Sequence, residues 1–124
     1  MDEDRNKLIE AWIQNQETFW ALEKLDDIVN RSHDDAWPIV IEIAKRTDSE
    51  DVLGSLAAGP LEDMLCAFGD HYYDLVRKAS EECFNFKRSL LMGIRINGEG
   101  SERIKELIQK IGEESIRDGW NPHL

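Results

Sequence analysis

The sequence predicts an all-α fold, a compact array of about seven or eight short helices in one domain spanning residues 1–124. Apolar residues recur three and four positions apart along most of the chain, as they do on the buried face of a helix. Glycine, proline and capping side chains interrupt these stripes at short intervals. Short connections favour antiparallel hairpins, and such an array can also stack as a right-handed superhelix of the HEAT type.

Two helices are expected on either side of Asn15-Gln16. Acidic residues at positions 2–4 suit a helix N-terminus. Apolar stripes follow at Leu8, Ile9, Trp12 and Ile13, and at Phe19, Leu22, Leu25, Ile28 and Val29. Next, Ser32 is expected to cap a buried helix that ends near Lys45-Arg46, with Pro38 in its first turn.

Thr47 and Glu50 form a predicted capping box for the next short helix. Gly59-Pro60 is expected to close it and to open another, because glycine suits a helix C-terminus and proline a first turn. A stripe from Leu61 to Phe68 follows. Glu62 and Asp63 would then lie in a first turn and stabilise the helix dipole, although such a pair can also serve acid–base chemistry or bind a hard cation.

The second half of the chain continues the helical pattern. Gly69 is expected to end one helix and Asp70 to cap the next, which carries the stripe from Tyr72 to Ala79. A further stripe runs from Phe86 to Ile94. Residues 97–100 form a predicted linker, 101–118 a C-terminal helix capped by Ser101 and ended by Gly119, and 119–124 a tail. The apolar stripe of this last helix is expected at Ile104, Leu107, Ile108, Ile111 and Ile116.

Composition excludes several classes of partner. The chain has 15 Lys and Arg against 26 Asp and Glu, a formal net charge of −11. Such a charge opposes binding to nucleic-acid phosphates and to anionic membranes, and it steers basic partners toward the protein. The same charge is also explained by solubility alone.

A cytoplasmic location is expected. The acidic start Met1-Asp2-Glu3-Asp4 is unlike a signal peptide, and no apolar run reaches the roughly 18 residues of a membrane span. Cys66 and Cys83 lack metal or redox spacing and are interpreted as reduced thiols.

The middle of the chain resembles a family of small bacterial proteins of unknown function, whose signature is close to Ala-Gly-Pro-Leu-Glu-Asp-Leu-Leu. The matching segments are Phe19-Trp20-Ala21-Leu22-Glu23-Lys24-Leu25, Ala36-Trp37, Ala58-Gly59-Pro60-Leu61-Glu62-Asp63-Met64-Leu65, Gly69-Asp70 and Phe86 to Leu90. The likeness covers about residues 8–94 and leaves the final helix outside. It departs from the family at Ile94-Arg95-Ile96, where members usually carry Trp. The resemblance implies an all-α fold and no known activity.

A metal-dependent hydrolase is one alternative hypothesis. His33, Asp34, Asp70 and His71 would supply its ligands if their helices meet. Helix capping explains the same residues. Nucleotide-binding loops, hydrolase elbows and zinc-protease motifs do not occur in the sequence, so we expect no enzyme with a familiar motif and no cofactor.

The leading hypothesis is an acidic protein-binding module, with an immunity protein that neutralises a basic toxin as its narrower form. Helical neighbours diverge by about 100°, so either Phe19 or Trp20 is expected to be exposed, and an exposed Trp suits a binding hot spot. The candidate contact residues are Glu17, Trp20, Glu23, Asp26, Asp27, Asp34 and Asp35. A structural or oligomer-forming helical repeat is the third hypothesis.

Overall fold

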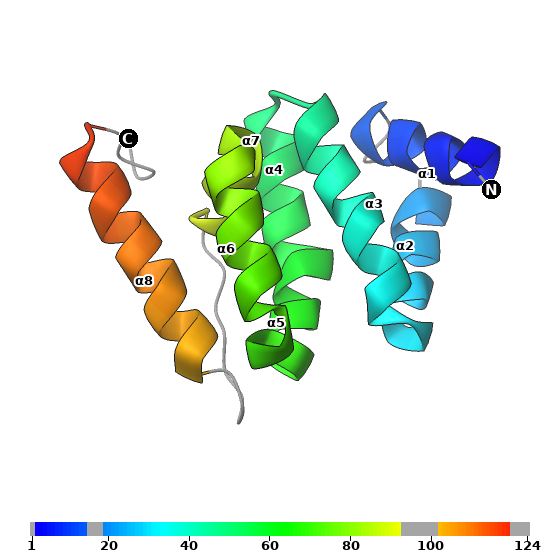
Figure 1. The fold of residues 1–124 in the computed structure, drawn as a ribbon. Coiled ribbons are helices and arrows are strands. Elements are labelled where there is room, and N and C mark those ends of the chain that lie inside the picture. Colours follow the sequence, from blue (N-terminus) through cyan, green and yellow to red (C-terminus); the bar gives the residue numbers. More distant parts are fainter. Residues whose placement is uncertain (1, 15–18, 93–101, 120–124) are drawn as a thin grey trace.

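The computed structural model describes residues 2–14, 19–92 and 102–119, and these ranges contain helices and no strand (Figure 1). The predicted all-α fold is therefore confirmed. Counting contiguous helical segments together gives six helices in these ranges, fewer than the predicted seven or eight. The segments are α1 Asp2–Gln14, α2 Phe19–Arg31, α3 His33–Arg46, α4 Glu50–Leu56, a π-helical turn Ala57–Leu61, α5 Glu62–Phe68, a 3₁₀ turn Gly69–Tyr72, α6 Tyr73–Glu82, α7 Phe84–Leu90 and α8 Glu102–Arg117.

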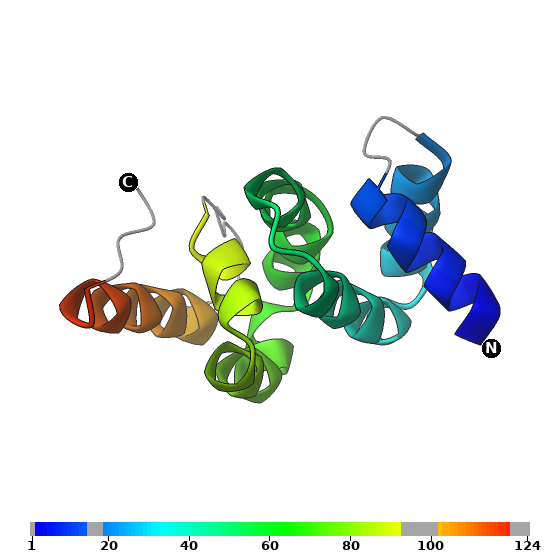
Figure 2. The same cartoon turned by 90° about the horizontal axis from the view of Figure 1, so that it is seen from above.

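The helices follow one another along an array, with α1 and α2 at one end and α8 at the other (Figures 1 and 2). Helix α1 contacts both α2 and α3, and α8 contacts α6. Arg46 ties α1 to α3, because its guanidinium donates to Asn6 Oδ1 at 2.9 Å and lies 3.4 Å from Glu10 Oε1. HEAT-type superhelical stacking stays a prediction.

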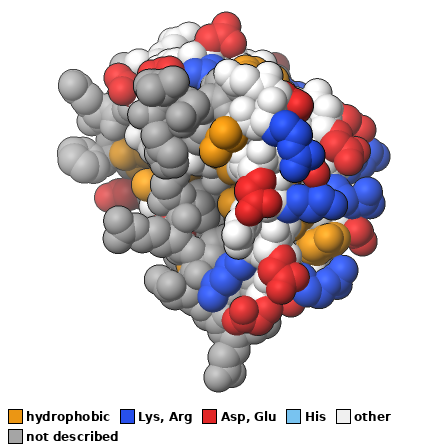
Figure 3. Space-filling model, turned by 90° about the vertical axis from the view of Figure 1, so that its left-hand side faces the viewer, with side chains coloured by type: hydrophobic (Ala, Val, Ile, Leu, Met, Phe, Trp, Pro, Cys, Tyr) orange, Lys and Arg blue, Asp and Glu red, His pale blue; other side chains and the backbone are white. Residues whose placement is uncertain are grey.

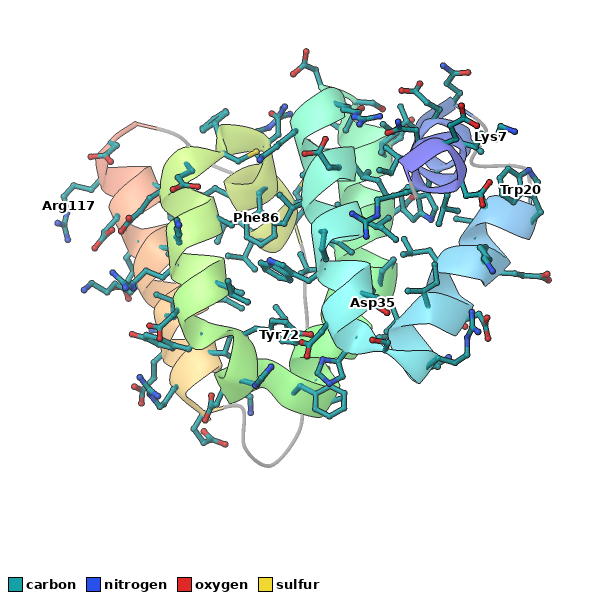
Figure 4. The ribbon with its side chains drawn as sticks, turned by 45° about the vertical axis from the view of Figure 1, so that its right-hand side comes forward. Lys7, Trp20, Asp35, Tyr72, Phe86 and Arg117 are labelled. Carbon is teal, nitrogen blue, oxygen red and sulfur yellow. The ribbon has the colours of Figure 1, made fainter. Side chains whose placement is uncertain are left out.

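Most residues of the apolar stripes form one core, as expected from their helical spacing, but Phe68 and Leu75 of the predicted stripes are 44% and 43% exposed. Trp12, Leu25, Ile43, Tyr72 and Phe86 are among its fully buried side chains. Figure 4 shows Tyr72 and Phe86 pointing into the space between α3 and α6, whereas Arg117 points away from the array. None of the described helices is both long enough and apolar enough to cross a membrane.

The last helix corrects one end of its predicted stripe. Ile104, Leu107 and Ile111 are buried, but Ile116 is 55% exposed and Ser115 is buried instead. The Ser115 hydroxyl donates to the Ile111 carbonyl at 2.8 Å, which satisfies its hydrogen bond inside the core.

The chain does not break at Gly59-Pro60, contrary to the sequence prediction. It passes from α4 to α5 through the π-helical turn, with right-handed helical backbone at Ala57, Leu61 and Glu62. Pro60 has no N–H to donate, and the turn that contains it has π-helical hydrogen bonding, which joins residues five apart. Glu62 and Asp63 therefore continue a helix and do not occupy a free N-terminus.

Two predicted caps are placed differently. Ser49, and not Thr47, caps α4, because its side chain accepts a hydrogen bond from the Val52 N–H at 3.4 Å. Asp70 was expected to cap its own helix, but its Oδ1 accepts from the Ile104 N–H at 3.1 Å. It thus caps the first turn of α8, while Ser101, the predicted cap, lies outside the described residues.

Other helix-end predictions are confirmed in part. Ser32 holds the position before α3 but makes no side-chain capping bond there, and Pro38 lies beyond the first turn. Gly119 follows α8 as predicted, and its positive φ of 97° is a conformation that glycine adopts without strain. Asn15-Gln16, the linker 97–100 and the tail beyond Gly119 lie outside the described ranges.

Replacing Asp70 tests the long-range cap. Asp70→Ala is expected to lower the free energy of unfolding by about 1 kcal/mol, because the Ile104 N–H loses its acceptor. Asp70→Asn keeps an acceptor and should cost much less. Equal losses in the two variants, measured by urea unfolding, would contradict the cap.

Candidate functional site

Two grooves lie beside helix α2, and residues of α1 and α2 line both of them. The first, which we call the Trp20 groove, encloses about 730 Å³ between α1, α2 and α3. Trp20 is 50% exposed, so the expectation that one residue of the Phe19-Trp20 pair is exposed is confirmed. The lining residues are Asp4, Arg5, Lys7, Leu8, Trp20, Lys24, Ile28, Asp35 and Ile39. Figure 4 labels Lys7, Trp20 and Asp35 at this end of the molecule.

The charge of the Trp20 groove is not the charge expected around this tryptophan. Arg5, Lys7 and Lys24 line it together with two carboxylates, Asp4 and Asp35, whereas the sequence suggested a setting of carboxylates alone. Lys24 follows Trp20 by one helical turn and therefore lies on the same face of α2. The charged lining is therefore mixed, with a surplus of one positive charge.

The second groove, which we call the acidic groove, encloses about 520 Å³ between α1, α2 and the π-helical turn. Its lining residues are Trp12, Leu22, Glu23, Asp26, Ser55, Ala58, Gly59, Pro60 and Asp63. The structure thus brings two predicted contact residues, Glu23 and Asp26, next to Gly59, Pro60 and Asp63. Among the described residues, no ion pair joins Glu23, Asp26 or Asp63 to a cation.

The pKa of the Asp63 carboxyl group reflects the burial and the negative charge of this groove. Partial burial raises its pKa above the usual 3.8, and the neighbouring charges of Asp26 and Glu62 raise it further. Repulsion between carboxylates is thus built into the groove, and a cation placed there would relieve it. Trp12 forms part of the apolar wall, and its indole N–H is buried with no partner among the described residues.

The remaining predicted contact residues lie elsewhere. Asp27 is exposed and pairs with Arg31 at 2.7 Å on the surface of α2. Asp35 lines the Trp20 groove, and Asp34 belongs to a cluster with two histidines. Glu17 lies outside the described residues. The seven candidates therefore do not form one surface.

His33, Asp34 and His71, which we call the histidine cluster, meet where α3 begins and the 3₁₀ turn passes. Asp34 Oδ1 lies 3.2 Å from His33 Nδ1 and 3.4 Å from His71 Nε2. The Tyr72 hydroxyl donates to the same oxygen at 3.0 Å and also contacts His33 Nδ1. Three of the four predicted ligands are thus together, and Asp70 caps α8 instead.

Tyr72 is the central polar side chain of this cluster. Burial raises the pKa of its hydroxyl, and the Asp34 carboxylate raises it further, so the hydroxyl keeps its proton. The hydrogen bond from Tyr72 lowers the pKa of Asp34, and the nearby histidines add to this effect. Asp34 is therefore a carboxylate with a fixed orientation at neutral pH.

The comparison with known protein families covers most of the chain. A model for the family of unknown function DUF6869 matches residues 10–116. The chain belongs to this family. No curated protein and no solved structure matches it significantly.

The DUF6869 match extends the predicted likeness. It includes α8 down to residue 116, whereas the sequence analysis left the final helix outside the resemblance. Most residues of the two grooves and the whole histidine cluster lie within the matched range, while Asp4, Arg5, Lys7 and Leu8 of the Trp20 groove precede it.

The opposite end of this DUF6869 chain has a mixed surface. Figure 3 shows the α8 end, where acidic and basic side chains alternate over the described residues with small apolar patches between them. Glu102 and Lys105 pair there at 3.8 Å. Spacings of three or four residues on a helix bring such charges together.

Sequence analysis missed the part of Tyr72 in the cluster and of Arg5, Lys7 and Lys24 in the Trp20 groove. Tyr72 was counted as an apolar core residue. Lys24 could have been assigned to the groove from the sequence, because Trp20, Lys24 and Ile28 follow one another at intervals of four residues and so lie on one face of a helix. Asp63 was assigned with Glu62 to a helix start, with acid–base chemistry or cation binding as the alternative, and its proximity to Asp26 was not predicted.

Asp63→Asn tests the repulsion in the acidic groove. A carboxyl whose folded-state pKa is raised stabilises the protein only while protonated, so this stability is present below about pH 3.8 and is lost as pH rises through the raised pKa. We therefore expect a higher Tm for Asp63→Asn than for the wild type at pH 7. The difference should shrink toward pH 3 and in high salt, and a difference independent of pH would contradict the repulsion.

Proposed function

We propose that this protein is a binding module that holds a cationic segment of another protein in the acidic groove. The observation that carries the proposal is the convergence of Glu23, Asp26 and Asp63 on an apolar wall, without a cation from the described residues paired to them. A Lys or Arg side chain lays its methylene stem on apolar surface and keeps its charged end near carboxylates. The groove suits that combination.

Charge supports the proposal both at long range, in solution, and at short range, within the groove. The net charge of −11 attracts basic partners from solution and raises association rates at low salt. Within the groove, partial burial and then repulsion from neighbouring carboxylates raise the pKa of Asp63, and the attraction of a bound cation offsets that repulsion. Both effects weaken as salt screens the charges.

The glycine of the π-helical turn gives independent support. A Cβ atom placed on Gly59 would meet no atom within 4 Å apart from those of its chain neighbours, so the groove beside it is open. A Cβ on the residue before a proline disfavours helical backbone, so Pro60 also accounts for glycine at this position. A partner segment could therefore approach the backbone of the π-helical turn closely.

Neutralisation of a basic toxin, the role of an immunity protein, is the narrower form of this proposal. It rests on the acidic groove and the net charge. Metal-dependent hydrolysis has the histidine cluster in its favour, and a structural helical repeat has the serial arrangement of helices. The acidic groove favours binding over both.

A second surface is available on the Trp20 groove. Trp20 is half exposed, and Arg5, Lys7 and Lys24 form no ion pair among the described residues. Asp4 and Asp35 line the same groove, so its cations exceed its carboxylates by only one. This groove therefore favours a largely apolar segment with a smaller preference for negative charge, whereas the acidic groove has no cation in its lining.

Charge-neutral variants test the acidic groove. Glu23→Gln with Asp26→Asn is expected to weaken capture of a basic partner from native cell lysate about tenfold at low salt, because two attractive charges are lost. The partner should be identified by mass spectrometry and should dissociate from the wild type at high salt.

The matched control is Glu82→Gln with Glu106→Gln, which removes two exposed charges elsewhere. It should retain most of the binding. Equal loss in both double variants would reduce the effect to net charge, and loss confined to Trp20→Ala would transfer the site to the Trp20 groove.

Substitutions at Gly59 separate stability from binding. Gly59→Ala is expected to change the free energy of unfolding by less than about 1 kcal/mol, because the gain in helix propensity is offset by the conflict between a Cβ and the Pro60 ring. Gly59→Met should fill the groove and weaken partner binding while the protein remains folded. Unfolding curves and titration calorimetry with the captured partner measure the two effects, and full binding by Gly59→Met would contradict the proposed contact.

A further inference from the structure

Two of the three histidines in the sequence lie together although they come from distant parts of the chain. His33 begins α3, and His71 belongs to the 3₁₀ turn that precedes α6. One nitrogen of each histidine and one oxygen of Asp34 all lie within 4.8 Å of one another. The three atoms offer two neutral imidazole donors and one carboxylate donor.

The spacing of these atoms matches a small coordination sphere. Zinc binds imidazole nitrogen and carboxylate oxygen at about 2.1 Å, so neighbouring ligands of a tetrahedral ion lie about 3.4 Å apart. Asp34 Oδ1 lies 3.2 Å from His33 Nδ1 and 3.4 Å from His71 Nε2. We propose that His33, Asp34 and His71 form a binding site for a divalent transition-metal ion of the zinc type.

Neighbouring aromatic residues hold the ligands in place. The His33 ring stacks on Phe68 with centroids 3.9 Å apart, and Tyr72 packs edge-on against both histidines. The Tyr72 hydroxyl donates to Asp34 at 3.0 Å and keeps that acceptor when His33 Nδ1 faces a metal ion. Hydrogen bonds of this kind orient ligands and strengthen metal binding.

The donor set selects the class of metal. Two imidazoles favour zinc, cobalt, nickel or copper, whereas magnesium and calcium prefer sites made of oxygen atoms. Three protein ligands leave a coordination position for water, which can reach the site because His71 is 58% and Asp34 68% exposed. The ion would join the start of α3 to the turn between α5 and α6, and binding would stabilise the folded state.

The proposal is tested on the full chain, purified without an affinity tag and treated with a chelator. Titration calorimetry with Zn²⁺ is expected to give one equivalent of bound ion. Co²⁺ alone should produce a visible absorption band with the intensity of a site that has four or five ligands. In excess Zn²⁺, each tenfold rise in free ion should raise Tm by about 5 °C.

Variants identify the ligands. His71→Ala and Asp34→Asn change exposed side chains and should remain folded, but they should lower zinc affinity at least tenfold and abolish the Co²⁺ band. Tyr72→Phe keeps all three ligands and should lower affinity about tenfold through loss of the orienting hydrogen bond. Asp35→Asn removes a neighbouring carboxylate outside the cluster and should bind as the wild type does.

Three results would overturn the site: no stoichiometric binding of Zn²⁺ or Co²⁺, unchanged affinity in His71→Ala, or loss of binding only in His123→Ala. The last result would assign the ion to the third histidine of the sequence. Binding of a protein partner to the acidic groove involves none of these residues, so the two proposals fail separately.

Discussion

The arrangement of the candidate partner site depends on one constraint, the passage of a helix through Pro60. An ordinary α-helix loses a hydrogen bond at proline and bends or stops there. The π-helical turn over Ala57–Leu61 contains Pro60, and the helix continues from this turn into α5. Asp63 is thereby carried to the groove wall that faces Asp26 on α2, and repulsion with Asp26 contributes to the raised pKa of Asp63. π-Helical turns inside α-helices occur frequently at functional sites.

Charged residues are distributed unevenly between the two grooves. Helix α2 presents Glu23 and Asp26 to one groove and Trp20 and Lys24 to the other, following the helical period. An acidic protein thus has one groove whose charged lining is entirely carboxylate and one in which three cations face the two carboxylates of Asp4 and Asp35. Such a separation fixes the orientation of a charged partner more than it adds to affinity. The net charge of the sequence, taken alone, would predict a negative charge over the whole surface.

Much of the fold could be predicted from residue periodicity. The stripes through Trp12, Leu25 and Ile104 were identified because a helix repeats its buried face every three to four residues, and these side chains are buried. The predictions were wrong where one local residue pattern is compatible with two different structures. Gly59-Pro60 is a sound signal for a helix boundary, but the π turn lets the chain continue. Asp70 has the right chemistry for a cap, yet the N–H that it binds belongs to Ile104, and no local rule connects the two.

The candidate sites were predictable in part, and for the same physical reason. Asp34 and His71 were named as possible partners because of their chemistry, and the fold brings them to 3.4 Å. The hydroxyl of Tyr72 that joins them was hidden by its membership of an apolar stripe. Glu23 and Asp26 were found by charge, but their neighbour Asp63 is remote in sequence. Contacts between distant helices depend on packing geometry, which periodicity does not specify.

The most direct test of the acidic groove as a partner site is amide chemical-shift mapping by NMR. A short peptide that alternates Lys with Leu would be titrated into the full chain at low salt, with a peptide of Glu and Leu as its counterpart. The account predicts that the basic peptide shifts the amides of residues 55–63, which line only the acidic groove, in a saturable manner, and that the acidic peptide leaves these amides unchanged. Shifts centred on residues 4–8 and 20–28 with the acidic peptide, and none in the acidic groove with the basic one, would contradict it.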